Sequence, residues 1–115
     1  MGSTADISLK QIIQRRIVYC QNDNNQELQF VNAGYVRGFN EMLMDIELSE
    51  TVFVKKYLNI LKDVKKVLDQ YDGLKTEEKD IKYVDELCGY NNAIVDVLSI
   101  IDYRLLYSEE QGIDL

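Results

Sequence analysis

Hydrophobic residues recur every three or four positions along most of this 115-residue chain, which is the spacing of amphipathic helices. The pattern predicts four helices, at residues 9–21, 27–48, 50–71 and 76–107. No segment shows the sustained alternation of a half-buried strand, and the chain has no proline to break its long segments. We therefore expect an all-α protein.

Polar residues and glycine at the segment ends support these four helices. Ser8 opens an S-x-x-Q capping box, and Asn24 and Ser49 precede the second and third segments. Gly73 can end the third helix, and Thr76 can cap the fourth. These signals place short connections between successive helices.

Each segment carries an apolar stripe that is expected to form the core. The fourth segment is the longest, at roughly 45 Å, so we expect it to bend near residues 89–92. The stripes consist of Leu9, Ile12, Ile13, Ile17 and Cys20; Leu28, Val31, Tyr35, Phe39, Met42, Leu43 and Ile46; Val54, Tyr57, Leu61, Val64, Leu68 and Tyr71; and Ile81, Val84, Leu87, Ile94, Leu98, Ile101 and Leu105.

Short connections favour antiparallel neighbours, so the expected architecture is an antiparallel four-helix bundle. We expect one domain over residues 1–115, with frayed ends at 1–7 and 108–115. The alternative is a pair of helical hairpins that open and pair with a second copy, giving a homo-oligomer.

A weak internal repeat links the second and fourth segments. Residues 34–46 align without gaps to residues 89–101 in the pattern G-Y-x-x-[GA]-[FI]-x-[ED]-[MV]-L-x-x-I, with four of thirteen positions identical. A duplicated helical hairpin would explain the match and would place these two helices in equivalent roles.

The repeat places small residues four positions apart, which allows two helix backbones to approach closely. We expect these residues to form a helix–helix contact in the core or in a dimer. The alternative is that they clear space for a ligand beside Tyr35 or Tyr90. The small residues are Gly34 and Gly38, then Gly89 and Ala93.

The net charge of −7 is unevenly distributed along the chain. Residues 27–50 sum to −4 and residues 76–115 to −7, whereas residues 1–26 sum to +1 and 51–75 to +3. This acidic balance argues against nucleic acid or an anionic membrane as the main partner and favours a basic protein. Lysines 55, 56, 62, 65 and 66 are expected to form a solvated face.

Composition also excludes most catalytic and metal sites. The chain has no histidine to act as a general base or metal ligand, and it contains no phosphate-binding loop motif. Cys20 and Cys88 form no CxxC motif and are expected to be buried structural thiols. We therefore expect a non-enzymatic protein with no metal site and no cofactor.

The chain has no apolar run of membrane-spanning length, and its N-terminus is polar. A cytoplasmic location with reduced thiols is the expectation.

The most informative surface is expected around the repeat, because it combines aromatic, amide and cationic groups. Within it, Arg37 is either bonded to an acid on a neighbouring helix or available to an anionic ligand. The candidate binding residues are Tyr35, Arg37, Asn40, Tyr90, Asn91 and Asn92.

The GYNNAI segment at residues 89–94, together with the abundance of Ile, Lys, Asn, Asp and Tyr, resembles small accessory proteins of phages and mobile elements of AT-rich bacteria. Because the chain has no catalytic constellation but a helical surface rich in tyrosine and charge, we expect an interaction protein that binds and inhibits or sequesters a host or phage protein. Two alternatives stay open: a module that sequesters a small anionic ligand such as a nucleotide signal, and a bundle like those of bacteriocin immunity proteins.

Overall fold

The computed structural model describes residues 4–72 and 81–111, and it describes side chains for residues 9–71 and 81–101. Four α-helices account for most of these residues, and no strand occurs among them. The helices are α1 (Thr4–Gln21), α2 (Gln29–Met44), α3 (Glu50–Asp72) and α4 (Ile81–Gln111), and a short 3₁₀-helix, η1 (Gln26–Leu28), precedes α2. The all-α class predicted from the periodicity is confirmed.

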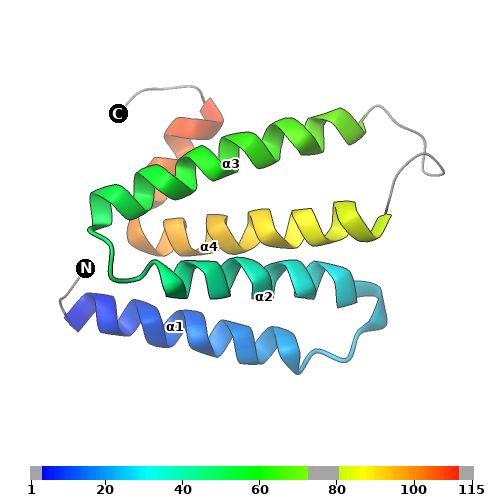
Figure 1. Cartoon of the computed structure of the whole chain (residues 1–115), viewed down its shortest axis with the longest axis horizontal. Coiled ribbons are helices and arrows are strands. Elements are labelled where there is room, and N and C mark those ends of the chain that lie inside the picture. The colour runs from blue at the N-terminus through cyan, green and yellow to red at the C-terminus, as the bar shows by residue number, and fades with distance from the viewer. Residues whose placement is uncertain (1–3, 73–80, 112–115) are drawn as a thin grey trace.

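Successive helices run antiparallel and form two hairpins, α1–α2 and α3–α4 (Figure 1). The second helices of the two hairpins, α2 and α4, lie side by side in the middle and run in the same direction. Helix α1 packs outside α2, and α3 packs outside α4. The bundle is therefore two antiparallel hairpins joined through a parallel central pair.

The central pair is held at backbone contact by glycine. A β-carbon built on Gly34 would lie 1.9 Å from the carbonyl oxygen of Glu86, and one on Gly89 would lie 1.9 Å from that of Val31. A β-carbon on Gly38 would lie 2.9 Å from the Cβ of Ala93. No side chain fits between the helices at Gly34 or Gly89, so only glycine allows this approach.

The contacts across the central pair are reciprocal. Gly34 faces Glu86 and Tyr90 of α4, and Gly89 faces Val31 and Tyr35 of α2. Glu86 and Tyr90 come 55 residues after Val31 and Tyr35 in the sequence. The aligned repeat has the same offset of 55 residues. The two copies of the repeat thus pack against each other in register, related by a local pseudo-two-fold axis along the helices.

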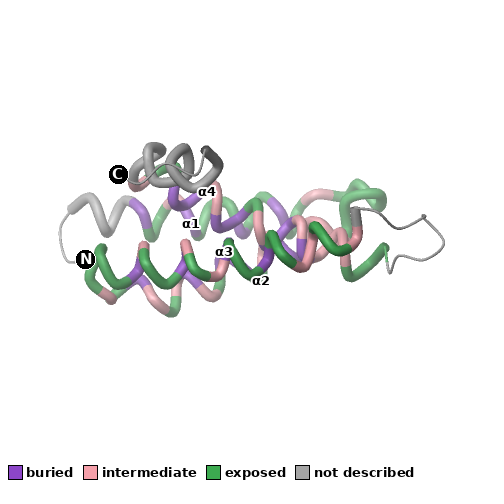
Figure 2. Tube along the Cα trace, turned by 90° about the horizontal axis from the view of Figure 1, so that it is seen from above, coloured by how far each residue is buried: buried purple, intermediate pink, exposed green. Residues whose placement is uncertain are grey.

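All four helices contribute to one core, and buried positions recur along each helix between exposed ones (Figure 2). Phe53, which lies outside the predicted stripe, is fully buried, whereas Leu28 and Ile81 are exposed. The stripe of α3 therefore starts one residue earlier than predicted. The fully buried large side chains are Ile13, Phe39, Met42, Phe53, Tyr57, Ile94, Val97 and Leu98.

Two predicted helix starts are wrong. Ser8 lies inside α1, which begins at Thr4, so Ser8 does not cap the helix. Asn25 rather than Asn24 caps the second segment, because its side-chain oxygen accepts a hydrogen bond from the backbone N–H of Glu27. That segment then opens with the 3₁₀ turn of η1 before α2 begins.

Helix α2 ends at Met44, four residues before the prediction. The backbone N–H groups of Asp45 and Ile46 donate to carbonyls three residues back, so the chain tightens into a turn instead of continuing the helix. Ser49 then caps α3 as predicted, its hydroxyl accepting from the backbone N–H of Val52. The predicted end at Gly73 and cap at Thr76 lie outside the described residues.

Helix α4 does not bend at residues 89–92. It runs straight past α2 and changes direction further on, toward its C-terminal end (Figure 1). The hydroxyl of Ser99 donates to the carbonyl of Val95 at 2.7 Å, a competing hydrogen bond of the kind that bends helices. Glycine at position 89 instead serves the contact with α2.

None of the helices described here has the length and apolar character needed to cross a membrane.

We predict that Gly34→Ala and Gly89→Ala each destabilise the protein by about 3 kcal/mol or more, because the added methyl group would force two backbones apart. This cost exceeds the gain of about 1 kcal/mol in helix propensity. Gly38→Ala should cost less, since its methyl group would lie 2.9 Å from the Cβ of Ala93 and 3.3 Å from the carbonyl oxygen of Tyr90, farther than the 1.9 Å at Gly34 and Gly89. Equilibrium unfolding in urea, followed by circular dichroism, measures the three effects.

The matched control is Asn40→Ala, an exposed position on α2 that should change stability by less than about 0.5 kcal/mol. Equal stabilities for Gly34→Ala, Gly89→Ala and this control would contradict the backbone contact.

Candidate functional site

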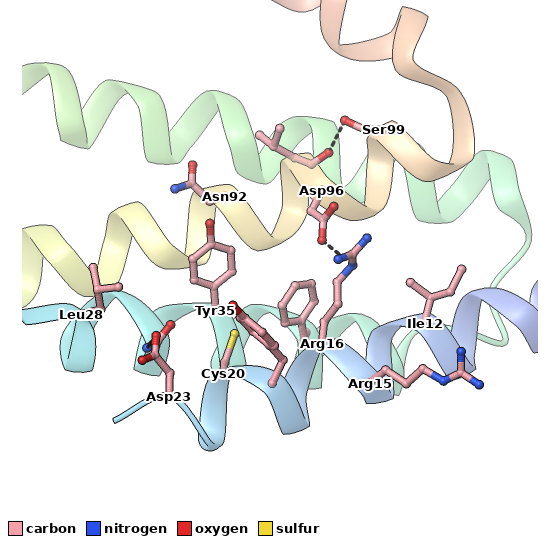
Figure 3. A pocket seen from close by; sticks show the side chains of 14 residues that line it. Ile12, Arg15, Arg16, Cys20, Asp23, Leu28, Tyr35, Asn92, Asp96 and Ser99 are labelled. Carbon is pink, nitrogen blue, oxygen red and sulfur yellow. Dashed lines mark hydrogen bonds and ion pairs between the residues drawn. The ribbon is translucent and has the colours of Figure 1, made fainter. Parts of the chain in front are cut away.

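An open groove of about 1020 Å³ lies between α1 and α4, with α2 as its floor (Figure 3). We call it the α1–α4 groove. All three helices supply both polar and apolar side chains to it, which is the mixed character of binding surfaces. Its lining includes Arg15, Arg16, Tyr19 and Cys20 from α1, Asn32, Tyr35 and Phe39 from α2, and Asn92, Val95, Asp96 and Ser99 from α4.

The two walls are joined by an ion pair. The Nε atom of Arg16 lies 2.7 Å from Oδ2 of Asp96, linking α1 to α4 (Figure 3). Burial raises the pKa of the Asp96 carboxyl and outweighs the opposing charge of Arg16. Asp96 is thus a partly desolvated carboxyl that gains from any further hydrogen-bond donor.

A second polar contact closes the groove near the α1–α2 connection. The side-chain amide of Asn32 donates to Oδ2 of Asp23, and the backbone N–H of Asn25 donates to Oδ1, both at 3.0 Å. The bond from Asn25 and then that from Asn32 lower the pKa of Asp23. These bonds hold the connection against α2 and keep the shape of the groove fixed.

The floor of the groove is aromatic. Tyr35 stacks on Phe39 with ring centroids 5.9 Å apart, and its hydroxyl points toward Asn92 (Figure 3). The hydroxyl of Tyr35 and the amide of Asn92 have no hydrogen-bond partner within the described part of the chain. Both groups are therefore available to a molecule lying in the groove.

Cys20 is buried against the groove and Cys88 is partly buried, and neither forms a disulfide within the described residues. Burial and the neighbouring carboxylates of Asp23 and Asp96 raise the pKa of Cys20. A thiol held in its protonated form is a weak nucleophile, so the groove does not supply an activated cysteine.

One rim of the groove carries large exposed apolar side chains. Tyr19 is 78% exposed and Val18 is 53% exposed, and both line a shallower pocket of about 540 Å³ beside Arg15. Exposed apolar groups gathered beside a groove are typical of interaction surfaces.

On the opposite side of the central pair, side-chain hydrogen bonds link α3 to the end of α2 and α4 to α2. The hydroxyl of Tyr57 on α3 donates to Asp45, which follows α2, and the ammonium group of Lys56 donates to the same oxygen at 2.6 Å. The hydroxyl of Tyr90 donates to Glu41. Burial first, then these carboxylates, raise the pKa values of both phenols.

The six candidate residues from the sequence separate into two groups. Tyr35 and Asn92 lie in the α1–α4 groove. Tyr90 is only 7% exposed and bonds to Glu41, beside Tyr57 of α3.

The other candidates lie outside both described pockets. The guanidinium of Arg37 sits 4.2 Å above the ring of Tyr90 and 3.5 Å from Glu86 of α4. It follows the first of its two predicted roles, bonding to an acid on a neighbouring helix. Asn40 is exposed and Asn91 is half-buried.

Sequence reasoning missed the contribution of α1. Arg15, Arg16 and Tyr19 form one wall and rim of the groove, yet their spacing in the sequence only marks them as the polar side of a helix. The signal available was the pairing of an arginine doublet with a tyrosine one turn later. Only the position of α1 beside α4 turns that signal into a site.

Comparison with protein-family models, with curated proteins and with solved structures finds no match. Among the described residues, no three potential metal-ligating side chains come together.

We predict that Asp45→Asn weakens the protein at neutral pH and that this effect disappears in acid. Burial would raise the pKa of Asp45, but the hydrogen bonds from Lys56 and Tyr57, together with the charge of Lys56, lower it overall. A carboxyl group whose pKa is lowered by folding stabilises the folded protein at pH values above its pKa in the unfolded chain, about 3.9. This stabilisation is lost as the pH falls through the pKa of the group in the folded protein. The free energy of unfolding of the wild type should exceed that of the variant by about 1 kcal/mol at pH 6 and by much less at pH 3.

Urea unfolding at the two pH values measures this difference. Glu47→Gln, which removes an exposed carboxylate from the same turn, controls for the change in net charge. A difference between wild type and Asp45→Asn that stays constant with pH would contradict the bonding of Asp45.

Proposed function

We propose that this protein is a non-enzymatic interaction protein that binds a partner protein through the α1–α4 groove and its rim, and thereby inhibits or sequesters that partner. The observation that carries the proposal is the exposure of Tyr19 and Val18 beside an open groove with a tyrosine floor. Other large apolar side chains are also exposed, among them Met44 and Val52, but Tyr19 and Val18 lie together at the rim of the groove.

The composition of the surface supports a protein as the ligand. Tyrosine and arginine dominate the energetics of many protein interfaces, because each combines a large contact area with hydrogen bonding. Tyr19, Tyr35 and Arg15 provide both residue types within a single groove. The net charge of −7 would favour association with a basic partner.

The geometry gives less support to an anionic ligand bound around the glycine repeat. Gly34 and Gly89 are covered by the backbone of the opposite helix, and Arg37 is already paired with Glu86. The resemblance to phage accessory proteins is compatible with a factor that interferes with a host protein in the cytoplasm, and we include this in the proposal.

The test is site-specific photo-crosslinking in cells of the source organism. A photoreactive amino acid replaces Tyr19 in one variant and Met44 in a matched control, because Met44 is similarly exposed, at 84%, and lies outside the groove. We expect a discrete crosslinked partner protein from position 19 and none from position 44. The same partner from both positions, or only a second copy of this chain, would contradict the proposal.

Binding of the identified partner, once purified, then provides a quantitative check. We expect Val18→Ala to weaken binding at least about fivefold, through lost apolar contact. Val52→Ala, equally exposed at 53% but on α3, should leave binding unchanged. Equal affinities for the two variants would exclude the rim from the interface.

A further inference from the structure

Tyr35 on α2 and Tyr90 on α4 occupy equivalent positions in the two hairpins. The internal repeat pairs residues of α2 and α4 that are 55 positions apart, and the reciprocal contacts of Gly34 and Gly89 follow the same register. The outer helices correspond with an offset of 44, since the buried positions 9, 13, 17 and 20 of α1 match the buried positions 53, 57, 61 and 64 of α3. The surroundings of the two tyrosines can therefore be compared residue by residue.

Tyr90 is covered by a cation and accompanied by two carboxylates. The guanidinium of Arg37 lies 4.2 Å from the centroid of the ring and 3.5 Å from Glu86, which precedes Tyr90 by about one helical turn. The hydroxyl of Tyr90 donates to Glu41, and the residue is only 7% exposed. A guanidinium over the ring, with carboxylates beside it, is thus an arrangement that the chain itself builds.

The ring of Tyr35 lacks this cover. The residue equivalent to Arg37 is Asn92, which is shorter and carries no charge. No cation lies over the ring of Tyr35 within the part of the chain that the structure describes. Tyr35 is half-buried and lines the α1–α4 groove, so its ring is accessible to a ligand there. The groove exposes a tyrosine that the other hairpin covers with arginine.

Two carboxylates line the groove together with Tyr35 (Figure 3). Asp96 on α4 is equivalent to Glu41, the acceptor of the other tyrosine hydroxyl. Asp23 is held at the opposite end by its bond to Asn32, which precedes Tyr35 by about one helical turn. Tyr35 therefore has one carboxylate at an equivalent position and one that the α1–α2 connection supplies.

The arginines of the groove do not take the place over Tyr35. Arg16 reaches Asp96 from the α1 wall, and the guanidinium of Arg15 points away from Tyr35 (Figure 3). Asp96 offsets the charge of Arg16, whereas Asp23 is bonded by neutral amide groups. The charge of Asp23 is therefore available to an incoming cation.

From this comparison we infer that the partner protein inserts an arginine into the α1–α4 groove, with its guanidinium over Tyr35 as that of Arg37 lies over Tyr90. The inference rests on the proposed function, since it specifies the residue by which the partner is bound. A guanidinium stacks on aromatic rings, and its five N–H donors suit the carboxylate of Asp23 and the amide oxygen of Asn92. The net charge of −7 favours a basic partner segment.

The first test uses two small probes, Nα-acetyl-arginine methylamide and the neutral Nα-acetyl-citrulline methylamide, which has nearly the same shape. Each is titrated into the isotope-labelled full chain and followed by NMR. We expect saturable shifts at Tyr35, Asn92 and Asp23, and binding of the arginine probe at least about fivefold tighter than that of the citrulline probe, because only arginine is a cation. Equal affinities for the two probes, or shifts confined to residues outside the groove, would overturn the inference.

Asn92→Arg tests the position of the guanidinium, because it gives α4 the counterpart of Arg37. Asn92 is exposed, so the variant should fold, and its new arginine should cover Tyr35 and weaken binding of the arginine probe at least about tenfold. The matched control is Asn40→Arg, which adds the same charge at an exposed position outside the groove and should weaken binding less than about twofold. Equal effects of the two variants would contradict binding over Tyr35.

The partner itself separates failure of this inference from failure of the proposed function. In the partner segment crosslinked from position 19, we expect Arg→Ala at one arginine to weaken binding at least about tenfold, and Arg→Lys to restore only part of that loss. A partner that crosslinks from position 19 but binds unchanged after all arginines of that segment are replaced would overturn the inference and leave the proposed function standing. Absence of any crosslinked partner would overturn both.

Discussion

The backbone contact between α2 and α4 is the constraint on which the rest of the molecule depends. Gly34 and Gly89 leave no room for a β-carbon against the carbonyl oxygens of the opposite helix. A glycine inside a helix costs about 1 kcal/mol relative to alanine, so each position must recover that cost through packing. Close packing along the central pair provides the stabilisation that offsets this cost. The same contact fixes the two hairpins relative to each other.

Once α2 and α4 are in contact, α1 and α3 pack on separate sides of the molecule. Three ion pairs join different parts of the bundle: Arg16 of α1 with Asp96 of α4, Arg37 of α2 with Glu86 of α4, and Lys56 of α3 with Asp45 just after α2. Such partly exposed pairs contribute little stability individually. Their role is positional: the pairs of Arg16 and Lys56 hold the outer helices in place, and the pair of Arg37 joins α2 to α4.

The two sides of this scaffold differ in how they are filled. Phe53 and Tyr57 fill the core under α3 with aromatic side chains, whereas a groove lies between α1 and α4 on the other side. The same backbone plan thus yields one sealed half that stabilises the fold and one half with a groove. A chain of 115 residues thus combines a core shared by all four helices with an open groove.

The sequence by itself determined the helical class, the four helical segments and the equivalence of residues 34–46 with 89–101, because these follow from local periodicity and composition. It did not determine the place where α4 turns, or the end of α2 at Met44, where the backbone bonds of Asp45 and Ile46 tighten the chain into a turn. Nor could it tell that Tyr35 and Asn92 border the groove while Tyr90 is buried beside α3, although the repeat makes the two tyrosines look alike. Only the tertiary structure decided this, because the environment of each tyrosine is set by the outer helix that packs over it.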